Sequence, residues 1–342
     1  MRYLIEKAED LVFIEKFFKK NFKIYFPDVK KEKIKKIEIE KKSPIWAKDT
    51  SLLRYKIFFD SQLKIVRGSA KKTHSKKKIF FLMNYLYWHG FNKGSYRIPK
   101  PLDYFEKANL LLYEEVEGET FASMLAQNKL KKIEQNVKRI AQWLAKLHTT
   151  KIKGVLFEKA LFLGKRKYQK MFSDIENLMP SLKKDLKFSI DLDLVQQAWR
   201  KKEYFALIHN DFYPGNIIIQ DSKIFGIDFD RAGIGPFLMD LATFYGCFDF
   251  SKEIWQIGLT KSERKKIQNL FLKVYCKKRN MQLKKIKDLL KPFLLKIFLD
   301  QIHYHFYFAK RGWRYMDKTA KNTAQRKIQA LIVEVAKLTE DL

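Results

Sequence analysis

One stretch of the chain, residues 204–240, alternates apolar runs with clustered polar side chains. An apolar run ends shortly before Asp211, and a second begins directly after Asn216. A third apolar run ends at Asp228. Short apolar runs bounded by turn residues are typical of buried strands. The pattern therefore predicts short strands joined by a turn, with these three polar residues gathered at one end.

The oxygen-bearing side chains of this stretch suit phosphoryl transfer assisted by a hard cation. Magnesium prefers oxygen ligands and usually takes one or two protein ligands besides substrate phosphates. Asn216 and Asp228 can supply such oxygens, which leaves the Asp211 carboxylate to accept a proton from an attacking hydroxyl. Each residue alone is common in ordinary turns. The whole set at this spacing favours the catalytic interpretation over a plain loop.

The same stretch resembles the catalytic segment of the aminoglycoside phosphotransferase and choline kinase-like family, small-molecule kinases that share the protein-kinase fold. The family pattern is His-x-Asp-x-x-x-x-Asn, then Ile-Asp-Phe, then a later Asp-Leu-Ala. This chain carries the pattern in the same order, at His209-Asn210-Asp211, Asn216, Ile227-Asp228-Phe229 and Asp240-Leu241-Ala242.

The resemblance implies a role for each matching residue. Asp211 is expected to act as the catalytic base, and Asn216 and Asp228 are expected to hold Mg²⁺ across the phosphates of ATP. Support of the loops or of the metal ligands, rather than reaction, is expected of His209, Asp230 and Asp240.

The resemblance also implies an α+β fold with two lobes. A small nucleotide-binding lobe with an antiparallel sheet would cover residues 1–117 and end in a hinge near 113–118. A larger, mostly helical catalytic and substrate-binding lobe would cover 118–342. In the hinge, the adenine of ATP is expected to bond the backbone around Glu114 and Val116.

Hydrophobic periodicity predicts the local elements of both lobes. A hairpin is expected from two strands, residues 53–59 and 63–67. Thr260 and Glu263 form the capping-box pattern of a helix that starts there. Helices are also expected over residues 3–20, 79–88, 120–127, 133–148 and 289–308 and within 156–200, and strands within 30–42, 99–102 and 110–116.

Two features of the first lobe depart from the kinase pattern. Kinases cover the nucleotide phosphates with a glycine-rich loop, but the first glycine of this chain is Gly68. Kinases also pair a strand lysine with a helix glutamate. The strand cation is expected to be Lys64, with Arg67 as the alternative, but residues 75–89 contain no Asp or Glu. The partner comes from elsewhere, the phosphates are held differently, or ATP binding is lost.

The chain is strongly basic, with 70 Lys and Arg against 38 Asp and Glu and a net charge of +32. Such a charge attracts anions, so we expect an anionic or membrane-presented acceptor and peripheral contact with anionic membrane. A solvated basic surface without a specific partner is the simpler alternative. No signature of a nucleic-acid-binding module is present, so no specific nucleic-acid partner is expected.

Composition excludes several other classes of protein. A hydrophobic content of 46% and an aromatic content of 15% exclude a disordered chain. No apolar run reaches the roughly 18 residues that span a bilayer, and the N-terminal residues are not expected to form a signal peptide. The cysteines, Cys247 and Cys276, form neither a disulfide framework nor a ligand cluster. A cytoplasmic setting is therefore expected.

The expected function is ATP-dependent phosphorylation of a hydroxyl group on a small molecule or glycan. Two alternatives remain open. One is a kinase of lipopolysaccharide or another glycan at the inner face of a membrane, which the basic C-terminal part favours. The other is a pseudokinase, a binding protein without turnover, which the missing helix glutamate favours and the intact catalytic segment opposes.

Overall fold

The chain forms two compact units, and each is described by itself. The first comprises Met1–Gly118 and Ile218–Asp230, and the second comprises Glu119–Ile217 and Arg231–Leu342. The segment Ile218–Asp230, which the sequence placed in the helical lobe, thus clusters with the first unit. The computed structural model describes residues 4–29, 31–42, 49–72, 74–152, 165–182, 196–197, 200–249, 258–312 and 316–340.

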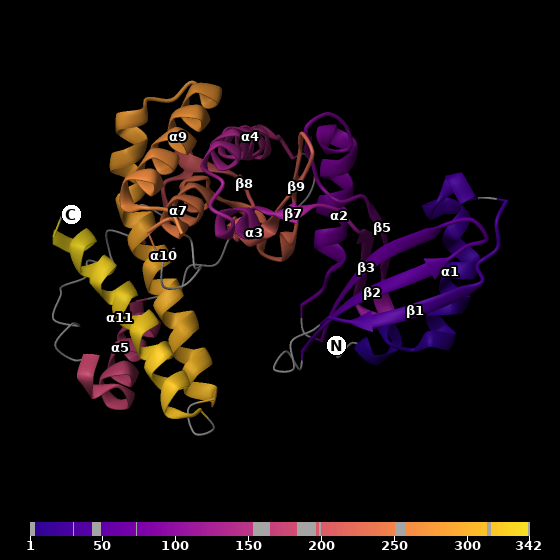
Figure 1. Cartoon of the computed structure of the whole chain (residues 1–342), viewed down its shortest axis with the longest axis horizontal. Coiled ribbons are helices and arrows are strands. Elements are labelled where there is room, and N and C mark those ends of the chain that lie inside the picture. Colours follow the sequence, from indigo (N-terminus) through magenta and orange to yellow (C-terminus); the bar gives the residue numbers. More distant parts are fainter. Residues whose placement is uncertain are drawn as a thin grey trace. The chain divides into compact units, whose positions relative to one another are not determined.

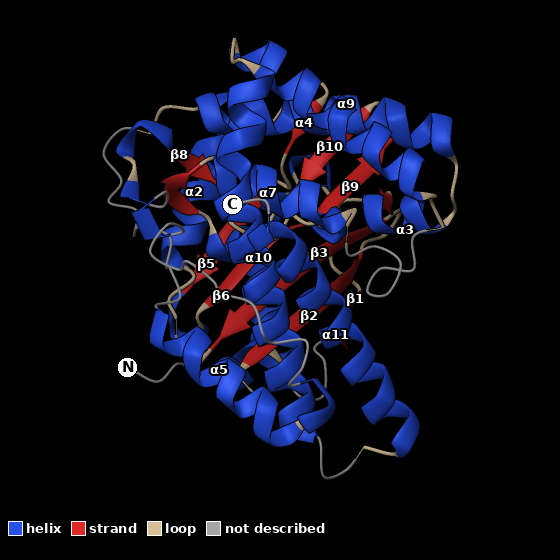
Figure 2. Ribbon diagram, turned by 90° about the vertical axis from the view of Figure 1, so that its left-hand side faces the viewer, coloured by secondary structure: helices blue, strands red, loops and turns tan. Residues whose placement is uncertain are grey.

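A five-stranded antiparallel sheet forms the centre of the first unit (Figures 1 and 2). The strand order is β1-β2-β3-β6-β5, and every neighbouring pair is antiparallel. Phe58 pairs with Leu63, which confirms the predicted hairpin and its turn at Asp60-Ser61. The strands are β1 (Lys36–Lys41), β2 (Thr50–Phe58), β3 (Leu63–Lys71), β5 (Pro101–Phe105) and β6 (Leu110–Glu114).

The core of the first unit lies between this sheet and helix α1 (Leu11–Tyr25). Successive side chains of a strand point to opposite faces. In β2, Tyr55 and Ile57 are fully buried and belong to one hydrophobic cluster with Phe18 of α1, whereas Arg54 lies on the opposite face. The sheet therefore has an apolar face that α1 covers and a second face that carries charged side chains.

Helix α1 begins later than the sequence pattern predicts, because Asp10 caps it. The Asp10 side chain accepts a hydrogen bond from the Phe13 amide at 3.2 Å, and a separate 3₁₀ turn, Ile5–Ala8, precedes it. An N-cap aspartate satisfies a backbone amide that the first helical turn leaves without a partner.

The first unit also contains a helix and short strands outside the five-stranded sheet and α1. Helix α2 (Lys77–Leu86) continues into a wider turn, Tyr87–Phe91, in which Gly90 adopts a φ of 109°. The two-residue strand β4 (Tyr96–Arg97) pairs in parallel with β10 (Lys223–Gly226), and β10 neighbours β9 (Ile217–Gln220). Strands β9 and β10 are the two strands predicted after Asn216.

The second unit is mostly helical. Helices α4 (Leu130–Thr149) and α9 (Lys261–Arg279) pack side by side, as do α10 (Leu283–Gly312) and α11 (Lys318–Glu340) (Figure 1). The antiparallel pair β8 (Phe205–Ile208) and β11 (Gly233–Pro236) supports the loop that follows β8. The other elements are β7 (Glu119–Thr120), α3 (Phe121–Ala126), α5 (Lys165–Leu178) and α7 (Leu238–Cys247).

The local expectations for the helical unit largely hold. The capping box that starts α9 is present, because Thr260 and Glu263 exchange hydrogen bonds of 2.8 and 3.2 Å. Residues 183–195, part of the predicted helical segment 156–200, lie outside the described residues. Among the helices that the structure describes, none combines the length and apolarity needed to cross a bilayer. A sheet unit and a larger helical unit confirm the predicted α+β class.

Candidate active site

The loop after strand β8 holds the predicted catalytic residues of the second unit in a tight turn. Asn210 adopts a left-handed conformation with a φ of 59°, which asparagine tolerates better than most residues. The amide of Tyr213 donates to the Asp211 carbonyl, and the amide of Asn216 donates to the Tyr213 carbonyl, each at 2.9 Å. Pro214 starts the short 3₁₀ turn that ends at Asn216.

Asp211 and Asn216 contact each other directly. The Asn216 Nδ2 atom donates to the Asp211 carbonyl at 2.9 Å and to the Asp211 carboxylate at 3.2 Å. Among the described residues the structure records no partner for Asn216 Oδ1. The amide is thus oriented by its nitrogen, and its oxygen remains as a ligand of the kind that a hard cation prefers.

A basic residue that the sequence analysis did not single out lies beside Asp211. An Arg231 guanidinium nitrogen is 3.7 Å from Asp211 Oδ1, and the Arg231 side chain is 68% exposed. The Arg231 carbonyl also accepts a hydrogen bond from Asn210 Nδ2 at 3.2 Å. In the sequence, only the position of Arg231 directly after Asp230 could have indicated that it lies near the site.

The Asp240 side chain holds the backbone of this loop through hydrogen bonds. Its buried carboxylate accepts hydrogen bonds from the backbone amides of His209 and Asn210, each at 2.7 Å. His148 Nε2 lies 3.0 Å from the same carboxylate, and His148 Nδ1 lies 2.8 Å from the Tyr275 hydroxyl. The loop backbone is therefore fixed by a buried network that reaches into α4 and α9.

Electrostatics assign the protonation of His148 in this network. Burial lowers the pKa of His148, although the neighbouring Asp240 carboxylate partly opposes the shift. The ring is therefore neutral near pH 7 and carries one proton. With that proton on Nε2, the ring donates to Asp240 and accepts from Tyr275, so both nitrogens are satisfied.

Aromatic side chains pack the loop against the helices. Phe212 is fully buried and stacks on Trp143 of α4, with ring centroids 5.5 Å apart and planes 7° apart. The Tyr213 hydroxyl accepts a hydrogen bond from Gln301 of α10. The two residues that follow Asp211 thus attach the turn to α4 and α10.

Two acidic side chains, one on α5 and one on α10, are bonded within the protein. Asp300 accepts a hydrogen bond from the Tyr168 hydroxyl at 2.6 Å and forms an ion pair with the buried Lys296. Asp174 accepts from the Tyr307 hydroxyl at 3.1 Å and pairs with Lys310 at 2.9 Å. Each carboxylate thus has its charge compensated by a lysine of α10.

In the first unit, Asp228 follows β10 in a left-handed conformation with a φ of 61°. Burial raises the pKa of Tyr113 on β6, the negative charge of Asp228 raises it further, and the positive charge of Arg67 opposes the shift. Asp228 and Arg67 therefore each lie within electrostatic range of the Tyr113 hydroxyl.

Strand register separates the two candidates for the phosphate-binding cation. Lys64 pairs with Ile57, so it lies on the face that α1 covers, and its amine forms an ion pair with Asp28. Arg67 pairs with Tyr113 and so shares the other face with it. Lys64, the first choice from the sequence, thus lies on the α1 side of β3, and Arg67, the alternative, lies on the opposite side.

The carboxylate partner of Arg67 comes from the predicted hinge. Glu115 is 12% exposed and forms ion pairs with Arg67 on β3 and with Arg54 on β2, the latter at 2.8 Å. A single, largely buried acid thus pairs with two arginines that are directly opposite each other in the sheet. Glu115 lies outside residues 75–89, the segment in which the kinase pattern places the acid.

Two backbone amides of the hinge are bonded within the protein, and the next one along the chain is not recorded as bonded to any described residue. The Glu114 amide donates to the Lys100 carbonyl at 2.9 Å, and the Glu115 amide donates to the Ile65 carbonyl at 3.2 Å. For the Val116 amide the structure records no partner among the described residues. The backbone between Glu115 and Gly118 is therefore available for recognition of a planar base.

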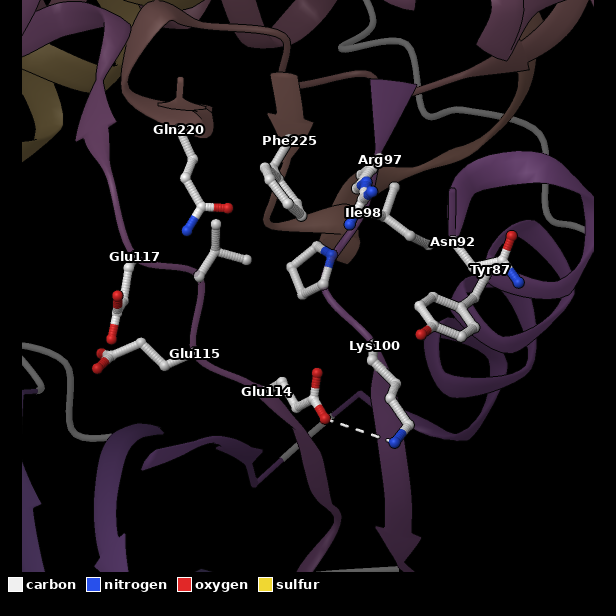
Figure 3. Close-up of a pocket in the computed structure, with 12 residues that line it drawn as sticks. Tyr87, Asn92, Arg97, Ile98, Lys100, Glu114, Glu115, Glu117, Gln220 and Phe225 are labelled. Carbon is white, nitrogen blue, oxygen red and sulfur yellow. Dashed lines mark ion pairs between the residues drawn. The ribbon is translucent and has the colours of Figure 1, made fainter. Parts of the chain in front are cut away.

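A cavity of about 270 Å³ in the first unit is lined by this hinge (Figure 3). Lys100 and Glu114 form an ion pair of 3.4 Å on one wall, as Figure 3 shows. The lining also includes Tyr87 and Phe225, so the cavity has both aromatic and charged side chains in its walls.

Gly118 ends the first unit in a conformation that requires glycine. Its φ is 141°, and a Cβ atom there would lie 2.5 Å from the Ile219 carbonyl oxygen. Only a residue without a side chain lets the hinge pass this close to β9.

Each unit carries an oxygen donor of the kind that metal ions bind. Among the described residues, no three His, Cys, Asp or Glu side chains gather as a ready-made metal cage. Mg²⁺ commonly binds through one or two protein oxygens together with water and substrate phosphates. The Asn216 amide oxygen and the Asp228 carboxylate are oxygen donors of that kind.

Comparison with protein-family models gives a match that includes the whole catalytic segment. Residues 62–266 match the model described as the phosphotransferase enzyme family. No curated protein matches the sequence.

Solved structures share the fold over nearly the whole chain. A choline kinase from Cryptosporidium parvum has a TM-score of 0.58 and 15% identity, with 97% of each chain covered. An ethanolamine kinase from Plasmodium vivax has a TM-score of 0.56 and 14% identity, covering 97% of this chain and 91% of its own. A spectinomycin phosphotransferase in complex with ADP and spectinomycin has a TM-score of 0.57 and 13% identity, with 94% and 98% covered. The predicted two-lobed kinase-like fold is confirmed.

Proposed function

Because this chain belongs to the phosphotransferase enzyme family, a family of kinase-type enzymes that phosphorylate hydroxyl groups of small molecules, we propose that it uses ATP and Mg²⁺. The acceptor is a hydroxyl of a small molecule or glycan. In the reaction, the acceptor oxygen forms a bond to the γ-phosphorus and the bond to the β-phosphate oxygen breaks. ADP leaves, and the hydroxyl proton passes to the Asp211 carboxylate.

The contact between Asp211 and Asn216 carries this proposal. A base that accepts a proton must be held in one orientation, and the Asn216 amide together with the loop bonds to Asp240 holds it. Asn216 and Asp228 supply oxygen ligands to Mg²⁺. When bound, the ion neutralises charge on the phosphate oxygens.

The nucleotide is held by the first unit in this proposal. The Val116 amide donates to the adenine, and the neighbouring Glu114 completes the hinge contact. Arg67, rather than Lys64, carries the positive charge for the phosphates, because it shares a sheet face with Tyr113 and is fixed by Glu115.

A phosphate-transfer screen with labelled ATP tests the proposal. The acceptors are aminoglycosides, amino alcohols, sugars and glycolipid cores. We expect Asp211→Asn to lower kcat by at least about 100-fold, as general bases typically contribute 10²–10⁴-fold, while ATP binding is retained. Asp221→Asn, in the exposed β9–β10 turn, is the matched control.

Metal dependence gives a second, independent measurement. Parent protein should gain thermal stability with ATP and Mg²⁺ together, since a ligand that binds only the folded state stabilises it. Asp228→Ala should abolish the Mg²⁺-dependent part of that gain. A parent protein that shows no shift would favour the pseudokinase alternative, and turnover unchanged in Asp228→Ala would refute the role of Asp228.

A membrane-presented glycan is the second candidate for the acceptor. The observation that favours it is an exposed basic face on α9, where Lys273, Lys277 and Lys278 form no ion pair among the described residues. Such residues attract anionic headgroups at about 1 kcal/mol each. Co-sedimentation with anionic vesicles, absent with neutral ones, would support this acceptor, and equal recovery with both would exclude it.

A further inference from the structure

A buried ammonium group in the first unit is paired with the residue that lies two positions after Asp228. The Lys76 side chain, at the N-terminal end of α2, is 3% exposed. Its amine contacts both carboxylate oxygens of Asp230, whose side chain is 32% exposed. The pair joins the start of a helix to a turn that is 154 residues away in the sequence.

The backbone around Lys76 is fixed independently of this pair. Asn109 is fully buried, adopts a left-handed φ of 47°, and accepts a hydrogen bond from the Lys76 amide at 2.6 Å. Its Nδ2 atom donates to the carbonyls of Lys71 and His74, each at 2.7 Å. One asparagine thus bonds the backbone at Lys71, His74 and Lys76, so the Lys76 side chain leaves from a fixed position.

The buried Lys76 ammonium group needs a carboxylate partner, and α2 contains none. An unpaired charge in the protein interior is costly, and removing one partner of a buried pair is far worse than replacing both. The sequence of α2, Lys77–Leu86, contains no Asp or Glu. The partner is instead Asp230, in the turn where Asp228 is held at a φ of 61°.

We propose that Lys76 is a positioning residue for Asp228, acting through Asp230. By fixing the carboxylate of Asp230, Lys76 holds the turn at Phe229 in place, which keeps Asp228 in its left-handed conformation. The buried side of that turn is already filled by Phe229, which is 1% exposed. Lys76 itself contacts neither nucleotide nor acceptor. The inference rests on the proposed role of Asp228 as a metal ligand.

Direct metal binding is the main test, with Lys76→Met, Asp230→Asn and the double variant. Affinity for Mn²⁺ in the presence of ADP is measured by electron paramagnetic resonance, together with ATP turnover. Each single variant should weaken Mn²⁺ binding by about 10–100-fold, as partners of ligand residues typically do, while the acceptor KM stays unchanged. The Mn²⁺ affinity of the double variant should be no lower than that of the weaker-binding single variant. Lys77→Met, on the exposed next residue, is the matched control.

The outcomes separate this inference from the proposed function. If Lys76→Met and Asp230→Asn weaken binding additively, Lys76 acts directly on the ligand and the inference is wrong. If Lys76→Met and Asp230→Asn bind Mn²⁺ as tightly as the parent, but Asp228→Ala does not, only the inference is wrong. If Asp228→Ala itself binds Mn²⁺ normally, the proposed metal site fails.

A charge reversal covers the case in which the single variants do not fold. The variant Lys76→Asp with Asp230→Lys keeps one positive and one negative group at the same two positions. Recovery of Mn²⁺ affinity to within about tenfold of the parent would support positioning through the pair. A folded charge-reversed protein without Mn²⁺ affinity would overturn it.

Discussion

The buried carboxylate of Asp240 accepts a hydrogen bond of 2.7 Å from the backbone amide of Asn210, a residue that precedes it by 30 positions. The other oxygen of the same carboxylate binds the His209 amide. Two successive amides of a left-handed turn are thereby held by one side chain. The orientation of Asp211, the next residue, follows from this brace.

Asp240→Asn should destabilise the second unit by about 1.5–3 kcal/mol, the usual worth of hydrogen bonds to a charged group. The substituted amide presents an NH₂ group to a backbone N–H, so one donor faces another. Chemical denaturation measures the loss, and Asp221→Asn at an exposed turn is the control. Unchanged stability would mean that the brace contributes nothing.

Arg67→Ala should weaken ATP binding by about 10–100-fold, because a charge-assisted hydrogen bond contributes about 1.5–3 kcal/mol. Lys64→Ala should leave ATP affinity within about twofold of the parent, since its amine is paired with Asp28 on the opposite face of the sheet. Isothermal titration with ATP and Mg²⁺ measures both constants. The reverse ranking would restore Lys64 as the phosphate-binding residue.

Gly118→Ala should cost about 1–3 kcal/mol of stability, the range expected when a side chain is forced into such a backbone conformation. The new Cβ would also lie 2.5 Å from the Ile219 carbonyl. Gly258→Ala is the control, because a Cβ there meets only ordinary contacts at 3.5 Å or more. Equal melting temperatures for the two variants would show that the hinge adapts freely.

Stability should fall as the pH decreases below about 6.5, partly through His305. Burial lowers the pKa of His305 to about 4, with the charge of Lys327 adding to the shift, and within the described chain its Nε2 atom has no hydrogen-bond partner. The unfolded chain therefore binds a proton before the folded one does. The contribution is fully present above the unfolded pKa of about 6.5 and is lost as the pH falls toward the folded value.

Denaturation of the parent and of His305→Asn at pH 7, 6 and 5 isolates this histidine. The variant should lose less stability than the parent between pH 7 and pH 5, because one of the groups that titrate differently on unfolding has been removed. Parallel pH profiles for the two proteins would show that His305 titrates alike in the folded and unfolded states.

Much of the fold could be read from the sequence where its signals are local. The hairpin of β2 and β3, the capping box at Thr260 and the strands after Asn216 depend on periodicity and turn chemistry over a few residues. The start of α1 differs from the prediction, and its cause is local as well. The apolar pattern begins at residue 3, but the Asp10 cap makes the helix begin at Leu11.

The sequence by itself contains the family pattern. The five-residue spacing of Asp211 and Asn216 within that pattern placed them in one short turn, where they are in contact. The sequence also determined that Lys64 and Arg67 lie on opposite faces of one strand, because side chains alternate. Only the tertiary structure decided which face α1 covers, that Glu115 holds Arg67, and that Lys76 meets Asp230. Such pairs join residues far apart in the chain, and their partners are chosen by packing rather than by any local spacing.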